Sequence, residues 1–178
     1  MKSKLRFSVV LAVAVAALAT AAVATAATLT ATATLTGTAG LSLNLPSNPS
    51  MSATLDGSDQ AVSYSPALGV VDARGSGGGW NLTVAATTFS DGLGHTLAAG
   101  TLTGATEACH SGSTCTLATN SVTYPVTLST TAAKFFTAAA SSGLGKVDVT
   151  PTVSVSVPGN SFAGTYTSTV TLATAVGP

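Results

Sequence analysis

The residues with the most chemical potential lie together in VDARGSGGGWNLTV, between Val71 and Val84. This stretch holds the only Trp of the chain and, outside the first six residues, the only Arg. Asp72 and Arg74 are two residues apart, so on a strand they share a face and can form an ion pair that clamps the Gly-rich turn. Alternatively, the guanidinium of Arg74 binds a carboxylate or phosphate of a partner, because its planar fork fits both groups.

Trp80 and Leu82 also share a strand face, because they are two residues apart. One interpretation is a core Trp whose N–H is bonded to a single acceptor. The other is an exposed aromatic platform on which a sugar or a peptide stacks. We therefore take Trp80 and Leu82, together with Asp72 and Arg74, as the candidate binding residues.

The glycines from Gly75 to Gly79 superficially resemble a phosphate-binding loop, but no Lys-Ser/Thr pair follows and a strand pattern comes next. They predict positive φ angles or a bulge before that strand. The two histidines, His95 and His110, have no serine elbow beside them, and the sequence contains no HExxH or EF-hand pattern. We expect no catalytic site and no cofactor, with a hydrolase of unrecognised site as the remote alternative.

Cys109 and Cys115 enclose the short loop CHSGSTC. In an exported protein such a pair predicts a disulfide. A zinc site that includes His110 is the alternative, but zinc needs about four ligands and His95 is distant in sequence. The sequence therefore favours the disulfide and predicts no metal site.

The N-terminus has the pattern of a secretory leader. Basic MKSKLR precedes an apolar run and Ala24-Thr25-Ala26, so we expect residues 1–27 to be a cleaved signal peptide, with an uncleaved membrane anchor as the alternative. The remaining chain has three basic and six acidic residues, a formal net charge of −3, and this argues against nucleic acid as a partner. The ending AVGP is not an LPxTG-like signal, so we expect a protein that is secreted free or held by non-covalent contacts.

Alternation of β-branched or apolar residues with Thr and Ser predicts half-buried strands through most of the chain. Residues 130–140 are rich in Ala and predict a short helix or a turn, and residues 105–120 predict a long loop stapled by the disulfide. Many short strands predict an all-β, antiparallel, immunoglobulin-like β-sandwich that forms a single domain over residues 28–178. The predicted strands are 28–36, 40–45, 51–56, 60–64, 68–73, 79–88, 100–103, 121–128, 146–157 and 164–175.

The run from Asp72 to Val84 resembles the first motif of WxL-domain proteins, bacterial surface proteins named for Trp-x-Leu. The family pattern D-x-R-G-x-G-x-G-W-x-L-x-V is matched at every specified position. The C-terminal GTYTSTVTLATAVGP is similar to the family's second motif, with Tyr166 and Pro178 in register. In that motif, Leu172 stands in the place of the Trp and Thr174 in the place of the Leu.

This resemblance implies a β-sandwich attached non-covalently to the cell wall through peptidoglycan, and the Ala/Thr-rich composition is similar to that of a high-GC Gram-positive branch. We therefore expect a secreted, wall-associated, non-enzymatic module that binds a wall polymer. The alternative is a structural or adhesin-like subunit that binds another surface protein, or further copies of itself, through its edge strands.

Overall fold

The computed structural model describes residues 32–37 and 40–178, and within them it contains strands and loops but no α-helix. The expected signal peptide, residues 1–27, lies outside the described residues, as does the start of the strand predicted at 28–36. Residues 35–178 form one compact unit. In the described part of the chain, no helix is long and apolar enough to cross a membrane.

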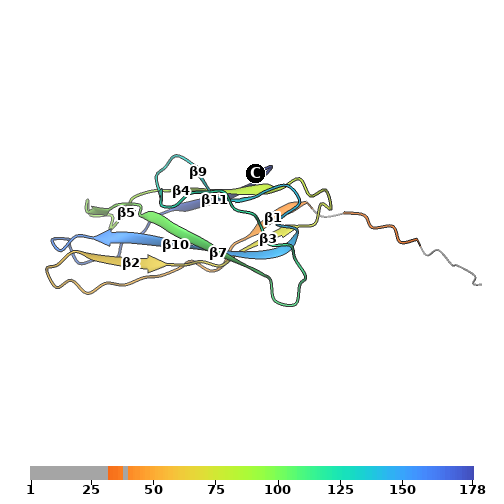
Figure 1. Cartoon of the computed structure of the whole chain (residues 1–178). Coiled ribbons are helices and arrows are strands. Elements are labelled where there is room, and N and C mark those ends of the chain that lie inside the picture. Colours follow the sequence, from red (N-terminus) through yellow and green to blue (C-terminus); the bar gives the residue numbers. More distant parts are fainter. Residues whose placement is uncertain (1–31, 38–39) are drawn as a thin grey trace, which may run out of the picture. The chain divides into compact units, whose positions relative to one another are not determined.

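The larger sheet is organised around its longest strand, β10 (Gly145–Val157). On one side, β3 (Leu68–Asp72) pairs with the first part of β10 and β2 (Gln60–Tyr64) pairs with the last part. On the other side lies β7 (Thr101–Cys109), which in turn pairs with β8 (Val126–Thr127). The sheet is completed by β1 (Leu41–Asn44) beside β3, and every pairing is antiparallel (Figure 1).

The smaller sheet contains three antiparallel strands in the order β11 (Val170–Val176), β4 (Trp80–Ala86) and β9 (Ala133–Ala138). It forms a second layer over the larger sheet (Figure 1). A short hairpin of β5 (Phe89–Ser90) and β6 (Thr96–Leu97) lies at one end. The predicted all-β, antiparallel β-sandwich is therefore confirmed, whereas immunoglobulin-like connectivity stays a prediction.

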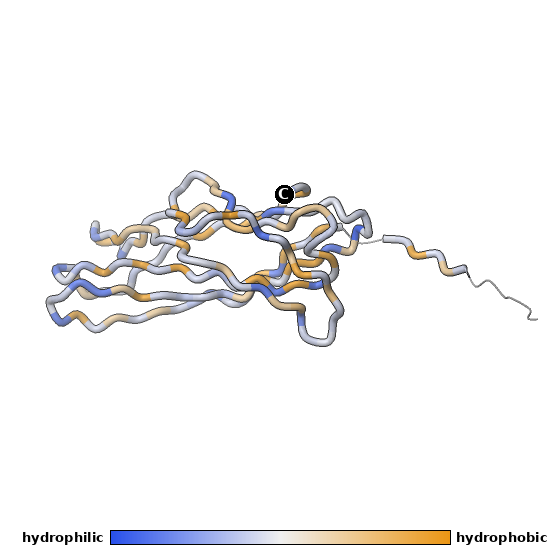
Figure 2. Tube along the Cα trace, in the orientation of Figure 1, coloured by the Kyte–Doolittle hydropathy of each residue, from blue (hydrophilic) through white to orange (hydrophobic). Residues whose placement is uncertain are grey.

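Alternation along the strands places one row of side chains between the two sheets. In β10, Val147, Val149, Val153 and Val155 are all buried, and the residues between them are more exposed. The apolar segments along the strand traces are visible in Figure 2. Burial of apolar surface stabilises the fold by roughly 25 cal/mol per Å², so these rows supply the main favourable term.

Residues 133–138 form the strand β9, so the prediction of a short helix or turn over 130–140 is wrong. The Ala content favoured a helix, but the two aromatic rings of this segment are both buried in the sandwich, and tertiary packing overrides the local propensity. Leu82 pairs with Phe136 and Thr83 with Lys134, so Phe135 is the extra residue of a bulge. The bulge interrupts the alternation and allows two consecutive Phe rings to enter the core.

Other predicted boundaries also need correction. The strands predicted at 40–45, 60–64, 68–73, 79–88 and 146–157 correspond to β1, β2, β3, β4 and β10, whereas residues 51–56 and 32–36 form no strand. In the predicted strand 121–128, only Val126–Thr127 is paired. Strand β7 continues to Cys109, so the predicted loop 105–120 is shorter, and β11 begins at Val170 rather than at residue 164.

Candidate functional site

Asp72 and Arg74 form the predicted ion pair at the end of β3. Asp72 follows Leu68 and Val70 on the buried face of the strand, and its side chain is 0% exposed. The Arg74 guanidinium donates through Nε to Asp72 Oδ1 at 2.9 Å and through Nη2 to Oδ2 at 2.8 Å. These hydrogen bonds hold the pKa of Asp72 below its ordinary value, against the effect of burial. The Nε and Nη2 groups of Arg74 are thus used within the protein, and an external carboxylate or phosphate as its partner stays a prediction.

The Arg74 guanidinium also joins the two ends of the Gly-rich turn, since Nη2 donates to the Gly79 carbonyl oxygen at 2.7 Å. Gly79 has a φ of 69°, and an added Cβ would lie 2.5 Å from the Ala138 carbonyl oxygen. Both constraints require glycine immediately before β4. The turn is thus a connection between β3 and β4, as predicted, and its positive-φ glycines set where Trp80 begins the strand.

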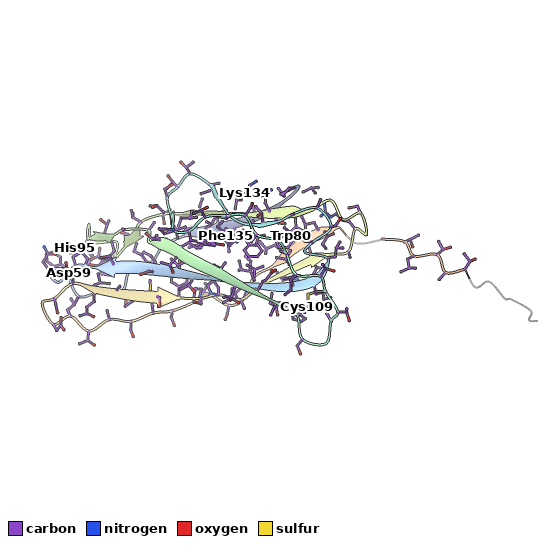
Figure 3. The ribbon with its side chains drawn as sticks, in the orientation of Figure 1. Asp59, Trp80, His95, Cys109, Lys134 and Phe135 are labelled. Carbon is purple, nitrogen blue, oxygen red and sulfur yellow. A yellow bond between two sulfur atoms is a disulfide. The ribbon has the colours of Figure 1, made fainter. Side chains whose placement is uncertain are left out.

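Trp80 and Leu82 are both core residues, each 0% exposed. The indole Nε1 of Trp80 donates to the Gly143 carbonyl oxygen at 2.9 Å, and its ring stacks on Phe136 with 5.9 Å between centroids. Figure 3 shows Trp80 near Phe135 between the two layers. The core interpretation is confirmed, and the exposed-platform interpretation is wrong.

The two stretches that contain the sequence motifs are neighbouring strands. In the β4–β11 ladder, Val84 pairs with Leu172, Leu82 with Thr174, and Trp80 with Val176. Paired residues point to the same side of a sheet, so Leu172 faces the core side, where it is half-buried and packs against the core cluster. Thr174 donates its hydroxyl to the Asn81 carbonyl oxygen at 3.2 Å.

The remaining positions of the second motif lie apart from each other. The Pro178 carbonyl oxygen accepts a hydrogen bond from Lys134 Nζ at 3.0 Å, which ties the chain end to β9. Tyr166 precedes β11 and donates its hydroxyl to the Phe162 carbonyl oxygen at 3.0 Å. The structure therefore gathers most of the candidate residues around β4 and leaves Tyr166 outside that group.

The disulfide between Cys109 and Cys115 is confirmed, with the two Cα atoms 5.5 Å apart. His110, the alternative zinc ligand, instead contacts Asp148, whose two carboxylate oxygens are each 3.0 Å from the imidazole Nδ1. Among the residues that the structure describes, no three or more His, Cys, Asp and Glu side chains lie together in a way that could hold a metal ion.

A pocket of about 520 Å³, which the sequence did not predict, lies at the end of the sandwich away from Trp80. Figure 3 shows His95 at this end of the sandwich and Trp80 inside it, toward the opposite end. The pocket floor includes Phe89, Leu97 and Val155, and the segment GNSFAGTY contributes Phe162 and Tyr166 to its wall. Two aromatic residues in a Gly/Ser-rich loop were the available signal for this site.

Comparison with known proteins identifies one family. A family model described as WxL domain surface cell wall-binding matches residues 44–175, which include the whole stretch from Asp72 to Val84 and most of β11. Comparison with curated proteins gives no match. Comparison with solved structures gives none either.

Proposed function

The chain belongs to the family of WxL-domain surface cell wall-binding proteins, and from this premise we propose that it is a non-enzymatic module that binds peptidoglycan directly. Membership of this family implies an extracellular, cell-wall-associated protein. The observation that carries the proposal is the extent of the match, because residues 44–175 include nearly the whole sandwich rather than one short motif.

The state of the acidic residues supports a non-enzymatic role. Each of the six acidic residues of the chain contacts a group of the protein itself, which gives each one a structural use. Burial raises the pKa of Glu107, but its carboxylate accepts the Ala118 N–H at 2.9 Å and so has a structural use. The other contacts are Asp56 with Ser58, Asp59 with Gly159, Asp72 with Arg74, Asp91 with His95, and Asp148 with His110.

Both histidines are paired with an aspartate, as the base and the acid of a Ser-His-Asp catalytic triad are. Whether either pair could be catalytic therefore depends on a nucleophilic hydroxyl beside the histidine. In the described part of the chain, neither His95 nor His110 has a Ser or Thr hydroxyl hydrogen-bonded to its other ring nitrogen. A nucleophile–base pair of the kind that acyl transfer needs is therefore missing from these two dyads.

Sedimentation with purified sacculi tests the proposal. We expect the protein to pellet with intact walls and equally with sacculi stripped of anionic polymers, and to stay soluble once the sacculi are digested. The same samples should show no release of reducing sugars or peptides. If the protein stays in the supernatant with both preparations, direct peptidoglycan binding is wrong.

A second candidate function, assembly through an edge strand, is favoured by β11. Within the described residues, β11 pairs with β4 on one side and with no strand on the other. Its sequence VTLATAV contains no charge and no Pro, which are the usual devices that block strand addition. The strand also exposes Val170 and Val176.

The opposite edge of the same sheet is covered. The segment 117–124 runs along β9, where the Asn120 side-chain oxygen accepts the Thr137 N–H at 3.0 Å and the Tyr124 hydroxyl donates to the Phe135 carbonyl oxygen at 2.7 Å. Among the described residues, β11 is then the edge of this sheet without a paired strand, although β1 lies close to it, and it is the candidate edge for a strand from another copy or another surface protein.

Light scattering separates this second function from wall binding. If β11 mediates assembly, the mass rises with concentration, and Ala173→Lys restores the monomer because it places a charge on the exposed edge strand. A wild-type protein that stays monomeric at high concentration and cross-links to no surface protein on its host would rule out assembly through β11.

A further inference from the structure

The pocket at the end of the sandwich away from Trp80 has the size and composition of a small-ligand site. Its volume of about 520 Å³ lies in the range of roughly 300–1,000 Å³ that is usual for such sites. The floor is apolar, with Val155 of β10, Val62 of β2 and Leu97 of β6. Hydroxyl-bearing residues, Ser161 and Thr165, lie in its wall.

Phe162 lies in this wall with its ring largely uncovered. Its exposed fraction is 62%, although the ring stacks on the His95 imidazole with 3.9 Å between centroids and 17° between planes. His95 covers one face, so the exposed area belongs to the rest of the ring. Small-ligand pockets are lined mainly by apolar and aromatic side chains, so an uncovered ring in this wall is a candidate stacking surface.

The ring is held in place by its neighbours. Asp91 hydrogen-bonds to the imidazole Nδ1 of His95 and also accepts the backbone N–H of Leu93 at 2.8 Å and of His95 at 3.1 Å, so the imidazole has a fixed orientation under Phe162. The Tyr166 hydroxyl donates to the backbone carbonyl oxygen of Phe162, which anchors the backbone that carries the ring. A ring fixed in this way loses little conformational entropy when a ligand stacks on it.

The charges near the pocket exclude an anionic ligand. Asp56, Asp59 and Asp91 lie in the loops at this end, and none of the basic residues that the structure describes, Arg74, Lys134 and Lys146, lines the pocket. None of these three acids lines the pocket, so its lining offers no carboxylate to a cation either. A neutral ligand with both an apolar face and hydroxyl or amide groups fits these constraints.

We propose that this pocket binds neutral sugar residues of the glycan strand of peptidoglycan, with the C–H face of one sugar stacked on Phe162 and its polar groups on the Ser161 and Thr165 side. This inference rests on the proposed function. It places peptidoglycan binding at one end of the domain, and it names the glycan rather than the peptide as the part of the polymer that is bound. The Asp72–Val84 stretch is at the other end and takes no part in the contact.

Titration with the neutral tetramer of N-acetylglucosamine, followed by NMR, tests this site in the wild-type protein and in two variants. We expect shifts at residues 161–166 and 89–97 in the wild type. Phe162→Ala should weaken binding about tenfold or more, because it removes the stacking surface. Leu93→Ala is the matched control, since Leu93 is 83% exposed in the same end loops but does not line the pocket. It should bind like the wild type.

Sedimentation of the same proteins with sacculi separates failure of this site from failure of the proposed function. If the wild type and Phe162→Ala pellet equally and the tetramer shifts no pocket residue, the site is wrong although wall binding stands. If the wild type does not pellet but the tetramer binds in a Phe162-dependent way, the site stands and direct wall binding is wrong. Shifts at the pocket caused by the isolated stem peptide, with none from the tetramer, would overturn the assignment to the glycan.

Discussion

The indole N–H of Trp80 donates a hydrogen bond to the carbonyl oxygen of Gly143, 2.9 Å away in the buried interior of the sandwich. This bond connects the first residue of β4 with the turn between β9 and β10. It also satisfies the one polar group of a Trp that is otherwise surrounded by apolar side chains. The Trp of the first sequence motif is therefore a component of the core and does not present its ring to a ligand.

Trp80→Ala should destabilise the domain by about 3–5 kcal/mol, because it leaves a large cavity beside Phe136. Trp80→Phe keeps a ring but leaves the buried Gly143 carbonyl without its donor, which costs about 1–3 kcal/mol. Urea unfolding measures both free energies. Stability close to the wild type in the Ala variant would contradict burial of Trp80.

Gly143→Ala should destabilise the domain more than Gly112→Ala. Both glycines have positive φ, 66° and 75°, so both substitutions carry a similar backbone strain. A Cβ at Gly143 would lie 2.6 Å from Trp80 Nε1, whereas nothing lies within 4 Å of a Cβ at Gly112. We expect the difference in unfolding free energy to be about 1–3 kcal/mol, the usual cost of overpacking. Equal losses would mean that Gly143 does not cover the indole.

Acid should weaken the fold through Asp72. Hydrogen bonds from Arg74 lower the folded-state pKa of this carboxyl, so its stabilising contribution is present above the unfolded pKa of about 3.9 and is lost as the pH falls through the folded value. Asp72→Asn should lower the melting temperature at pH 7. As the pH falls, the melting temperature of this variant should decrease less steeply than that of the wild type. Thermal melts between neutral and strongly acidic pH measure both effects, and parallel curves would contradict the role of Asp72.

Loss of the disulfide should cost about 2 kcal/mol on the chain-entropy estimate for so short a loop. The double variant Cys109→Ser, Cys115→Ser should therefore unfold at lower urea but keep the same fold. The reason is that β7 is also paired with β10 as far as Cys109. Circular dichroism and urea titration check the two parts of this prediction, and a variant that fails to form the sandwich would show that the disulfide is required for folding.

Much of the fold could be predicted because alternation and turn residues are local signals. These signals identified the strands with regular alternation, such as β10. They also identified the ion pair of Asp72 and Arg74, which are two residues apart. The β9 strand was not, because its Ala content indicates a helix and its two consecutive Phe residues break the period of two. Only the bulge opposite Leu82 and Thr83 explains that pattern, and a bulge depends on the partner strand.

The pocket could not be predicted for a related reason. Its lining includes Met51, Phe89, Val155 and Phe162, which are separated by long stretches of sequence and meet only after the two sheets are packed. The local motif indicated Trp80 as a candidate binding residue, because it contains the only Trp of the sequence. Among the described residues, Phe162 is the Phe with an exposed ring, and it has no comparable motif around it.

The central claim is that wall binding does not depend on Trp80. Its most direct test is the affinity of Trp80→Phe for purified sacculi, measured beside the wild type under conditions where both proteins are folded. We predict that the two proteins bind with affinities equal within about twofold, a difference of less than 1 kcal/mol. A folded Trp80→Phe variant whose binding is weaker by about tenfold or more, or about 1.4 kcal/mol, would contradict the assignment of Trp80 to the core alone.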